Sequence, residues 1–118
     1  MKLAALEVKL RAMAQAITAL INTRNEESNL PGCLRSVSWA DEVVVADMAS
    51  TDRTREVAEQ RGARVIKVPV AQGAFEWVRN FAATQCASEW ILVVDADERV
   101  MPALARTLRT LAQQAAPA

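Results

Sequence analysis

The sequence predicts an α/β fold, a three-layer α/β/α sandwich around a mostly parallel sheet. Apolar runs without alternation end in acidic residues, most clearly at Trp90–Asp95, and such runs are typical of strands covered on both faces. Segments with helical spacing separate these runs, so strand and helix alternate from residue 17 onward. Right-handed crossovers between parallel strands then place helices against the sheet.

Local sequence signals set the expected limits of each element. Strands are expected at 17–23, 43–47, 63–69 and 90–95. Helices are expected at 1–16, 29–38, 51–61, 75–86 and 102–114. Asn29 is the expected cap of one helix, and Ser50 or Thr51 that of the next. Gly62 is the expected left-handed residue after the helix over 51–61, and Pro102 fits the first turn of the helix over 102–114.

The two ends of the chain are expected to carry amphipathic helices. Over residues 1–16 the apolar side chains recur at spacings of three and four, and we separate this helix from a domain over 17–118. In the last helix a stripe of leucines is expected to face the core. These leucines are Leu104, Leu108 and Leu111.

Composition narrows the function classes. The 118 residues include 14 basic and 14 acidic side chains, and this balance argues against a nucleic-acid binder that relies on positive charge. Histidine is absent, which excludes histidine-dependent triads and histidine-bound zinc within this chain. Cys33 and Cys86 lack metal-ligand spacing, so we expect reduced thiols in a cytoplasmic protein, with a peripheral position at the inner membrane as the alternative.

Acidic side chains gather where the predicted strands end. Asp47, Asp52, Asp95 and Asp97 lie at or just past strand ends, and α/β sheets bind ligands beyond the carboxyl ends of their strands. If the extended backbone persists through Ala96, the last two aspartates point to the same side. Such oxygen ligands suit Mg²⁺ or Mn²⁺ shared with a diphosphate, where the metal stabilises the departing phosphate.

Three ordered stretches resemble the nucleotide-binding half of family 2 glycosyltransferases, which have the GT-A fold. They are TRNEE at 23–27, VVADMASTDRT at 44–54 and VVDADE at 93–98. Within the family, the pattern is most similar to the bacterial lipopolysaccharide-core glucosyltransferases. The resemblance implies a nucleotide-diphosphate sugar as donor, with UDP favoured, a divalent metal, and a glycan or lipid-linked acceptor.

The resemblance also implies roles for residues at the first two strand ends. Thr23, Asn25 and Glu26 would hold the base and ribose together with Asp47. Asp52 would line the nucleotide pocket. These five residues form the expected nucleoside side of the site.

The remaining implied residues belong to the donor side. Arg79 and Asn80 match an Arg-Asn pair that lies on the helix before the acidic strand, where it would approach the donor. Asp95 and Asp97 match the DxD element of the family. Asp95 would contact ribose or sugar, and Asp97 would hold the metal.

Two departures from the family pattern limit the resemblance. Most members carry glycine where Ala49 stands, so we expect this turn to be tighter or tilted. The family's catalytic base and acceptor site lie well beyond the DxD element, and we therefore expect a fragment, inactive in transfer, with an apolar edge that promotes self-association. Glu98 is a poor substitute for the base, because a carboxylate beside the metal would point at the phosphates of the donor and away from an acceptor.

Two other classes of protein share part of this pattern with the glycosyltransferases. An apolar strand ending in Asp-x-Asp also begins phosphatases of the haloacid-dehalogenase type, but there it ends the first strand, whereas here three strands precede it. A non-catalytic α/β module that binds nucleotide, or a receiver-like domain, is the other alternative. A receiver needs a lysine near its end, and no lysine follows Lys67.

Overall fold

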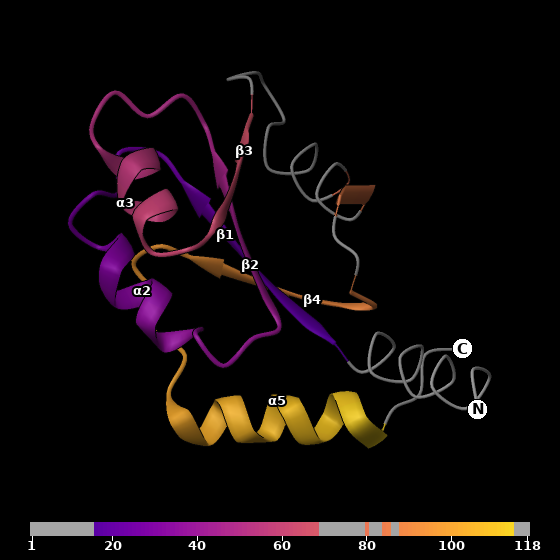
Figure 1. Ribbon diagram of the computed structural model, residues 1–118. Coiled ribbons are helices and arrows are strands. Elements are labelled where there is room, and N and C mark those ends of the chain that lie inside the picture. Colours follow the sequence, from indigo (N-terminus) through magenta and orange to yellow (C-terminus); the bar gives the residue numbers. More distant parts are fainter. Residues whose placement is uncertain (1–15, 69–79, 81–83, 86–87, 115–118) are drawn as a thin grey trace.

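A computed structural model describes residues 16–68, 80, 84–85 and 88–114. Its four strands form one parallel sheet in the order β3-β2-β1-β4 (Figure 1). The strands are β1 (Ile17–Thr23), β2 (Glu42–Asp47), β3 (Arg64–Lys67) and β4 (Trp90–Asp95). The helices with described bounds are α2 (Leu30–Ser36), α3 (Thr54–Gln60) and α5 (Pro102–Gln114). The predicted α/β class and parallel sheet are confirmed, and all four carboxyl ends meet at one edge.

Strand β1 is buried on both faces, as its unbroken apolar sequence predicts. Ala19 and Ile21 belong to a cluster that includes side chains of α2, α3 and α5, whereas Leu20 packs with Val44 in a second cluster. Ile21 and Leu20 point to opposite faces because side chains alternate along a strand. Both are at most 1% exposed, so β1 is the centre of the fold.

Two predicted helices fall largely outside the described residues. Of the segment 1–16, the structure describes only Ala16. Of the segment 75–86, it describes Asn80, Thr84 and Gln85, and these three residues are helical. The separation of residues 1–16 from a domain over 17–118 therefore stays a prediction.

The predicted start of the helix over 51–61 is wrong, and its predicted end is right. Helix α3 begins at Thr54 with Arg53 at the cap position and no side-chain cap bond, instead of being capped by Ser50 or Thr51. The hydroxyl of Ser50 donates to Asp47 at 2.5 Å, so it is engaged in the preceding loop. Gly62 has φ +83°, the left-handed conformation expected just past the helix.

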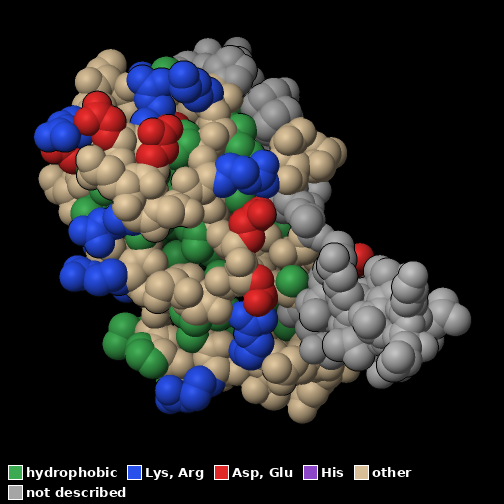
Figure 2. Space-filling view, viewed as in Figure 1, with side chains coloured by type: hydrophobic (Ala, Val, Ile, Leu, Met, Phe, Trp, Pro, Cys, Tyr) green, Lys and Arg blue, Asp and Glu red, His purple; other side chains and the backbone are tan. Residues whose placement is uncertain are grey.

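The predicted core stripe of the last helix is wrong. In α5 the buried residues are Ala105 and Ala112, whereas Leu104 and Leu111 are 48% and 53% exposed. A groove of about 340 Å³ separates α5 from β1 and β4, and Leu108 and Leu111 line it. The leucines therefore border an open groove instead of closing the core. Figure 2 shows hydrophobic side chains on the surface where α5 begins.

Arg109 fixes α5 to the amino-terminal end of the sheet. Its guanidinium donates to the Asp41 carboxylate at 2.7 Å and to the Trp39 carbonyl at 3.0 Å. Burial acts to raise the pKa of Asp41, but hydrogen bonds from Arg109 and from the Ile17 N–H outweigh it and lower that pKa. Within the described ranges, no helix has the length and apolar character needed to cross a bilayer.

Candidate functional site

A cleft of about 280 Å³ opens at the carboxyl ends of β1 and β4. Its lining residues come from these strand ends and from the loops that follow β1, β2 and β4. They are Asn22, Thr23, Arg24, Glu26, Met48, Asp95, Ala96 and Asp97. Four of them, namely Thr23, Glu26, Asp95 and Asp97, are residues that the sequence predicts for the site. Because β1 lies between β2 and β4, both predicted sides of the site converge on its end.

The extended backbone does not persist through Ala96, so this assumption about the two aspartates is wrong. Strand β4 ends at Asp95, and Ala96 and Asp97 form a turn. The N–H of Glu98 donates to the Asp95 carbonyl at 2.9 Å, and the Glu98 carboxylate accepts from the Asp95 N–H at 2.8 Å. Asp95 and Asp97 nevertheless line one cleft, because the turn curls back over the strand end.

The oxygen atoms around this cleft suit a hard divalent cation. The carboxylates of Asp95 and Asp97 are exposed, and no hydrogen bond or ion pair with another described side chain engages them. The Asn22 amide oxygen is buried, has no hydrogen-bond partner among the described residues, and belongs to the strand neighbour of Asp95. Within the described residues, no group of three or more His, Cys, Asp or Glu could hold a metal alone. The site therefore fits Mg²⁺ or Mn²⁺ that takes further oxygens from a phosphate ligand and water.

Asp47 is buried and organises the loop that follows β2. Its carboxylate, in a residue that is 1% exposed, accepts hydrogen bonds from the Thr23 hydroxyl at 2.8 Å and the Ser50 hydroxyl at 2.5 Å. The Ser50 N–H donates to it at 3.1 Å, and the Arg55 Nε lies 3.7 Å away. Three of about four acceptor positions on the carboxylate are therefore in use. Asp47 lies behind the cleft wall and not in the cleft lining.

Asn25 joins the loop after β1 to the loop after β2. Its side-chain oxygen accepts from the backbone N–H groups of Thr51 at 2.7 Å and Asp52 at 3.3 Å. Its own N–H donates to the Ser50 hydroxyl oxygen at 2.9 Å. The backbone of Asn25 has φ 54°, a conformation that asparagine tolerates better than most residues. Asn25 therefore shapes the wall of the cleft from behind.

Asp52 links the same two loops from the other end. Its carboxylate accepts from the N–H of Thr54 at 2.9 Å, from the Thr54 hydroxyl, and from the Glu27 N–H at 3.2 Å. Burial acts to raise the pKa of Asp52, but these bonds lower it below its usual value, with the Thr54 hydroxyl contributing most. Like Asn25 and Asp47, Asp52 braces the loops and is not in the cleft lining.

Ala49 adopts a left-handed backbone conformation, which glycine tolerates best. Its φ is 51°, in the left-handed region, where a Cβ costs roughly 1 to 2 kcal/mol. We expect Ala49→Gly to raise the free energy of unfolding by about 0.5 kcal/mol, after allowing for the greater freedom of glycine in the unfolded chain. Denaturant unfolding measures this change. Ala103→Gly, on the exposed side of α5, is the matched control and should lower stability by about 1 kcal/mol.

The predicted Arg-Asn pair is only partly described. Arg79 lies outside the described residues. Asn80 is helical and exposed, and it is not among the residues that line the cleft. The roles assigned to both stay predictions.

Sequence reasoning missed four residues of the cleft lining: Ala96, which lies between the two predicted aspartates, and three others. Arg24 lies inside the TRNEE stretch and Met48 directly follows Asp47, so motif position was a signal for both. Asn22 is a polar residue at the end of an otherwise apolar strand, which was also a signal. Arg24 makes no ion pair with any described side chain, so its guanidinium is available to an anion.

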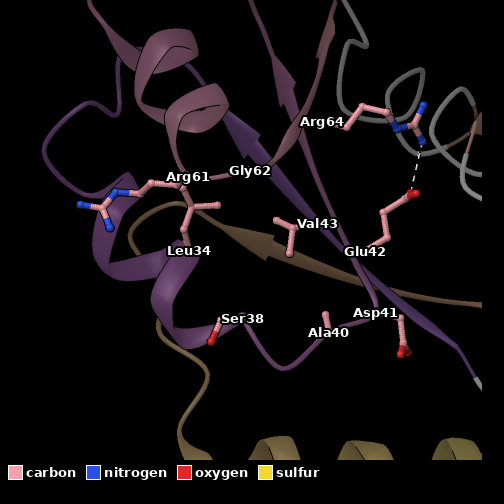
Figure 3. Close-up of a pocket in the computed structure, with 9 residues that line it drawn as sticks. All are labelled: Leu34, Ser38, Ala40, Asp41, Glu42, Val43, Arg61, Gly62 and Arg64. Atoms are coloured by element: carbon pink, nitrogen blue, oxygen red, sulfur yellow. Dashed lines mark hydrogen bonds and ion pairs between the residues drawn. The ribbon is translucent and has the colours of Figure 1, made fainter.

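A second cavity, of about 440 Å³, lies at the end of the sheet where β2 and β3 begin (Figure 3). Three of its four charged side chains already have partners: Arg64 pairs with Glu42 at 3.2 Å, and Asp41 pairs with Arg109 at 2.7 Å. In Figure 3 the Arg61 guanidinium points away from the cavity. Ligands of parallel sheets bind beyond the carboxyl ends of the strands, and this cavity lies at the amino ends. The smaller cleft is therefore the better candidate site.

Two curated relatives of this chain are named as glycosyltransferases and are longer than it is. An uncharacterized glycosyltransferase of Rickettsia bellii is 39% identical over 89 residues, which cover 75% of this chain and 30% of the relative. The lipopolysaccharide core biosynthesis glycosyltransferase LpsC of Rhizobium meliloti is 31% identical over 98 residues, covering 80% of this chain and 36% of LpsC. The chain thus spans only about a third of the length of these relatives.

A solved glycosyltransferase shares the fold. The crystal structure of glucosyl-3-phosphoglycerate synthase from Mycobacterium tuberculosis with Mg²⁺ and UDP superposes with a TM-score of 0.61 at 26% identity, covering 80% of this chain and 37% of the synthase. Another crystal structure of that enzyme holds Mn²⁺, UDP and phosphoglyceric acid. The sequence profile described as Glycosyl transferase family 2 matches residues 18–116. Because this match runs from β1 to past the end of α5, the chain belongs to glycosyl transferase family 2.

Proposed function

We propose that this chain forms the donor-binding part of a glycosyltransferase that uses a nucleotide-diphosphate sugar with Mg²⁺ or Mn²⁺. The observation that carries the proposal is the cleft beyond β1 and β4, in which the carboxylates of Asp95 and Asp97, which pair with no described side chain, face the same space as Arg24. Anionic and cationic groups side by side suit a metal–diphosphate complex, in which the metal meets the carboxylates and the phosphate meets the arginine. The Mycobacterium tuberculosis synthase, which binds UDP with Mg²⁺, supports the choice of UDP.

The nucleoside would lie against the ends of β1 and β2. Thr23 and Glu26 line the cleft there and would contact base and ribose. Asn25, Asp47 and Asp52 would act on the nucleoside mainly by holding the two loops together, since their side-chain oxygens already accept hydrogen bonds. One acceptor position of Asp47 stays open to a donor group of the base.

The donor sugar and diphosphate would lie against the end of β4. Asp97 would hold the metal, and Asp95 would contact ribose or sugar. Arg79 and Asn80 would approach the donor from the helix before β4. When bound, the metal would supply Lewis-acid stabilisation of the departing nucleoside diphosphate.

The acceptor would be a glycan or a lipid-linked molecule. A lipopolysaccharide-core acceptor is the more specific form of this proposal, and the similarity to LpsC supports it. The cytoplasmic location expected from the sequence stays a prediction. Family membership removes the reason to consider a haloacid-dehalogenase phosphatase. A non-catalytic nucleotide-binding module differs from the proposal in turnover and not in binding.

Calorimetry with UDP tests the proposal. We expect UDP to bind in the presence of Mn²⁺ and to bind at least tenfold more weakly in EDTA, because the Asp97 carboxylate and the diphosphate otherwise repel each other. Asp97→Asn should remove the metal dependence and leave the binding of uridine unchanged. Glu59→Gln, an exposed acid on α3, is the matched control and should behave like the unchanged chain. Equal affinities in Mn²⁺ and EDTA would contradict the metal role.

A further inference from the structure

We infer that Arg99, lying on Gly32 of helix α2, is a positioning residue that holds the loop bearing Asp97 in the shape needed for metal binding. This inference rests on the proposed function, because it assigns Arg99 to the same metal site. Arg99 lies outside the cleft lining and would not touch the ligand. It would act through the backbone on either side of Asp97.

The Arg99 guanidinium donates to three carbonyl groups. Its Nη1 donates to the carbonyls of Ala96 and Glu98, each at 2.8 Å. Its Nη2 donates to the Asn29 carbonyl at 3.0 Å, at the start of α2. The first two carbonyls belong to the residues on either side of Asp97. One planar fork therefore fixes the Asp97 turn and ties it to a helix.

Gly32 makes room for this guanidinium. A Cβ at position 32 would lie 2.7 Å from the Arg99 Nε and 2.8 Å from its Nη2, closer than side chains tolerate. Gly32 lies inside α2, where glycine is less favourable than alanine. Its φ is not positive, so backbone conformation does not require a glycine there. The Arg99 guanidinium occupies the space that a side chain at position 32 would fill, and this is the physical reason for a glycine within this helix.

Helix α2 supports the same loop at two more points. The Cys33 thiol donates to the Asp95 carbonyl at 3.6 Å, and the Ser36 hydroxyl oxygen accepts from the Val100 N–H at 3.0 Å. Burial raises the pKa of Cys33 to about 11, so the thiol keeps its proton at neutral pH. Positions 29, 33 and 36 share one side of a helix. The loop backbone is thus fixed before and after Asp97 by contacts with one helix face.

Removing Arg99 separates this positioning role from a simple effect of charge. A cation close to Asp97 repels a metal, so charge alone predicts that Arg99→Ala binds Mn²⁺ more tightly. The positioning role predicts the opposite, because the Asp97 turn loses its support. Arg99→Lys keeps the charge but lacks the planar fork, and the positioning role predicts that it fails to restore affinity.

Mn²⁺-dependent UDP binding, measured by calorimetry on the whole chain, tests the inference. We expect Arg99→Ala and Arg99→Lys to weaken it by about tenfold, as loss of groups that orient metal ligands usually does. Uridine binding in EDTA should change less than twofold. Arg106→Ala, an exposed arginine on α5, is the matched control and should bind like the unchanged chain. Unchanged or tighter binding by Arg99→Ala, or full affinity in Arg99→Lys, would overturn the positioning role.

Thermal unfolding tests the contact between Arg99 and Gly32 separately. In the unchanged chain we expect Gly32→Ala to lower Tm, because the new methyl group displaces the guanidinium. In the Arg99→Ala background the same substitution should raise Tm by about 4 °C, since only the helix preference remains. An equal shift of Tm in both backgrounds would show that Gly32 does not make room for Arg99. Failure of the unchanged chain to bind UDP with Mn²⁺ would overturn the proposed function and the positioning role of Arg99 together. The Tm comparison tests only the contact between Arg99 and Gly32.

Discussion

Asp47→Ala should lower the free energy of unfolding by about 3 kcal/mol. The substitution leaves the Ser50 N–H and hydroxyl without an acceptor and leaves the buried Thr23 hydroxyl with only the Ala46 carbonyl at 3.5 Å, and each unsatisfied buried group costs about 1 to 3 kcal/mol. Asp47→Asn keeps the size of the side chain and one acceptor oxygen, so its loss should be about half as large. Denaturant unfolding measures both.

Glu42→Ala is the matched control for Asp47, because Glu42 lies at the other end of the same strand. It pairs with Arg64 at the surface, and exposed ion pairs contribute only about 0 to 1 kcal/mol. Where Asp47→Asn stays folded, we expect uridine binding to weaken by roughly 1.5 to 3 kcal/mol, from the loosened loop and the lost acceptor. An Asp47→Ala chain as stable as Glu42→Ala would refute the bracing role of Asp47.

A polypeptide of these 118 residues should not transfer sugar to an acceptor at enzyme-like rates. Direct displacement at a sugar carbon needs a base within hydrogen-bond reach of the acceptor oxygen. The chain has no histidine, and the Glu98 carboxylate accepts from the Asp95 N–H in the acidic turn. Loss of a base alone lowers the rate by roughly two to four orders of magnitude. Slow hydrolysis of the donor is compatible with this expectation.

A donor-turnover assay with UDP-glucose measures transfer and hydrolysis together, and glucosyl-3-phosphoglycerate synthase serves as its positive control. Light scattering on the same sample tests self-association with a second copy of the chain. The exposed Val93 on β4, which is a sheet edge among the described strands, and the groove beside α5 support that association. A monomer that glycosylates an acceptor at enzyme-like rates would show that both expectations are wrong.

The parallel sheet could be predicted because its signals are local. Strands β1 and β4 match the predicted limits 17–23 and 90–95, since unbroken apolar runs bounded by polar residues need little tertiary context. The inward face of α5 could not be predicted in the same way. The spacing of Leu104, Leu108 and Leu111 is helical, but the side that faces inward depends on where Arg109 fixes the helix.

For the site, the sequence predicted residue positions better than residue roles. Asp95 and Asp97 from the strand-end pattern, and Thr23 from the family resemblance, line one cleft. It could not show that Asn25 and Asp47 lie behind the wall, because their partners are loop groups far away in the sequence. The turn at Ala96 was also unpredictable, since it depends on bonds from Glu98 and Arg99 to nearby backbone groups.

The two walls of the cleft differ in how far apart in the chain their contacts lie, and this orders their assembly. The bonds Thr23–Asp47 and Glu26–Thr54 close loops of 24 and 28 residues, whereas the contacts of Arg99 with Asn29 and of Cys33 with Asp95 close loops of 70 and 62. Closing the longer loops costs roughly 1 kcal/mol more chain entropy. During synthesis the loops after β1 and β2 can therefore join while β4 is still being made. The turn that carries Asp97 is then added to loops that have already formed.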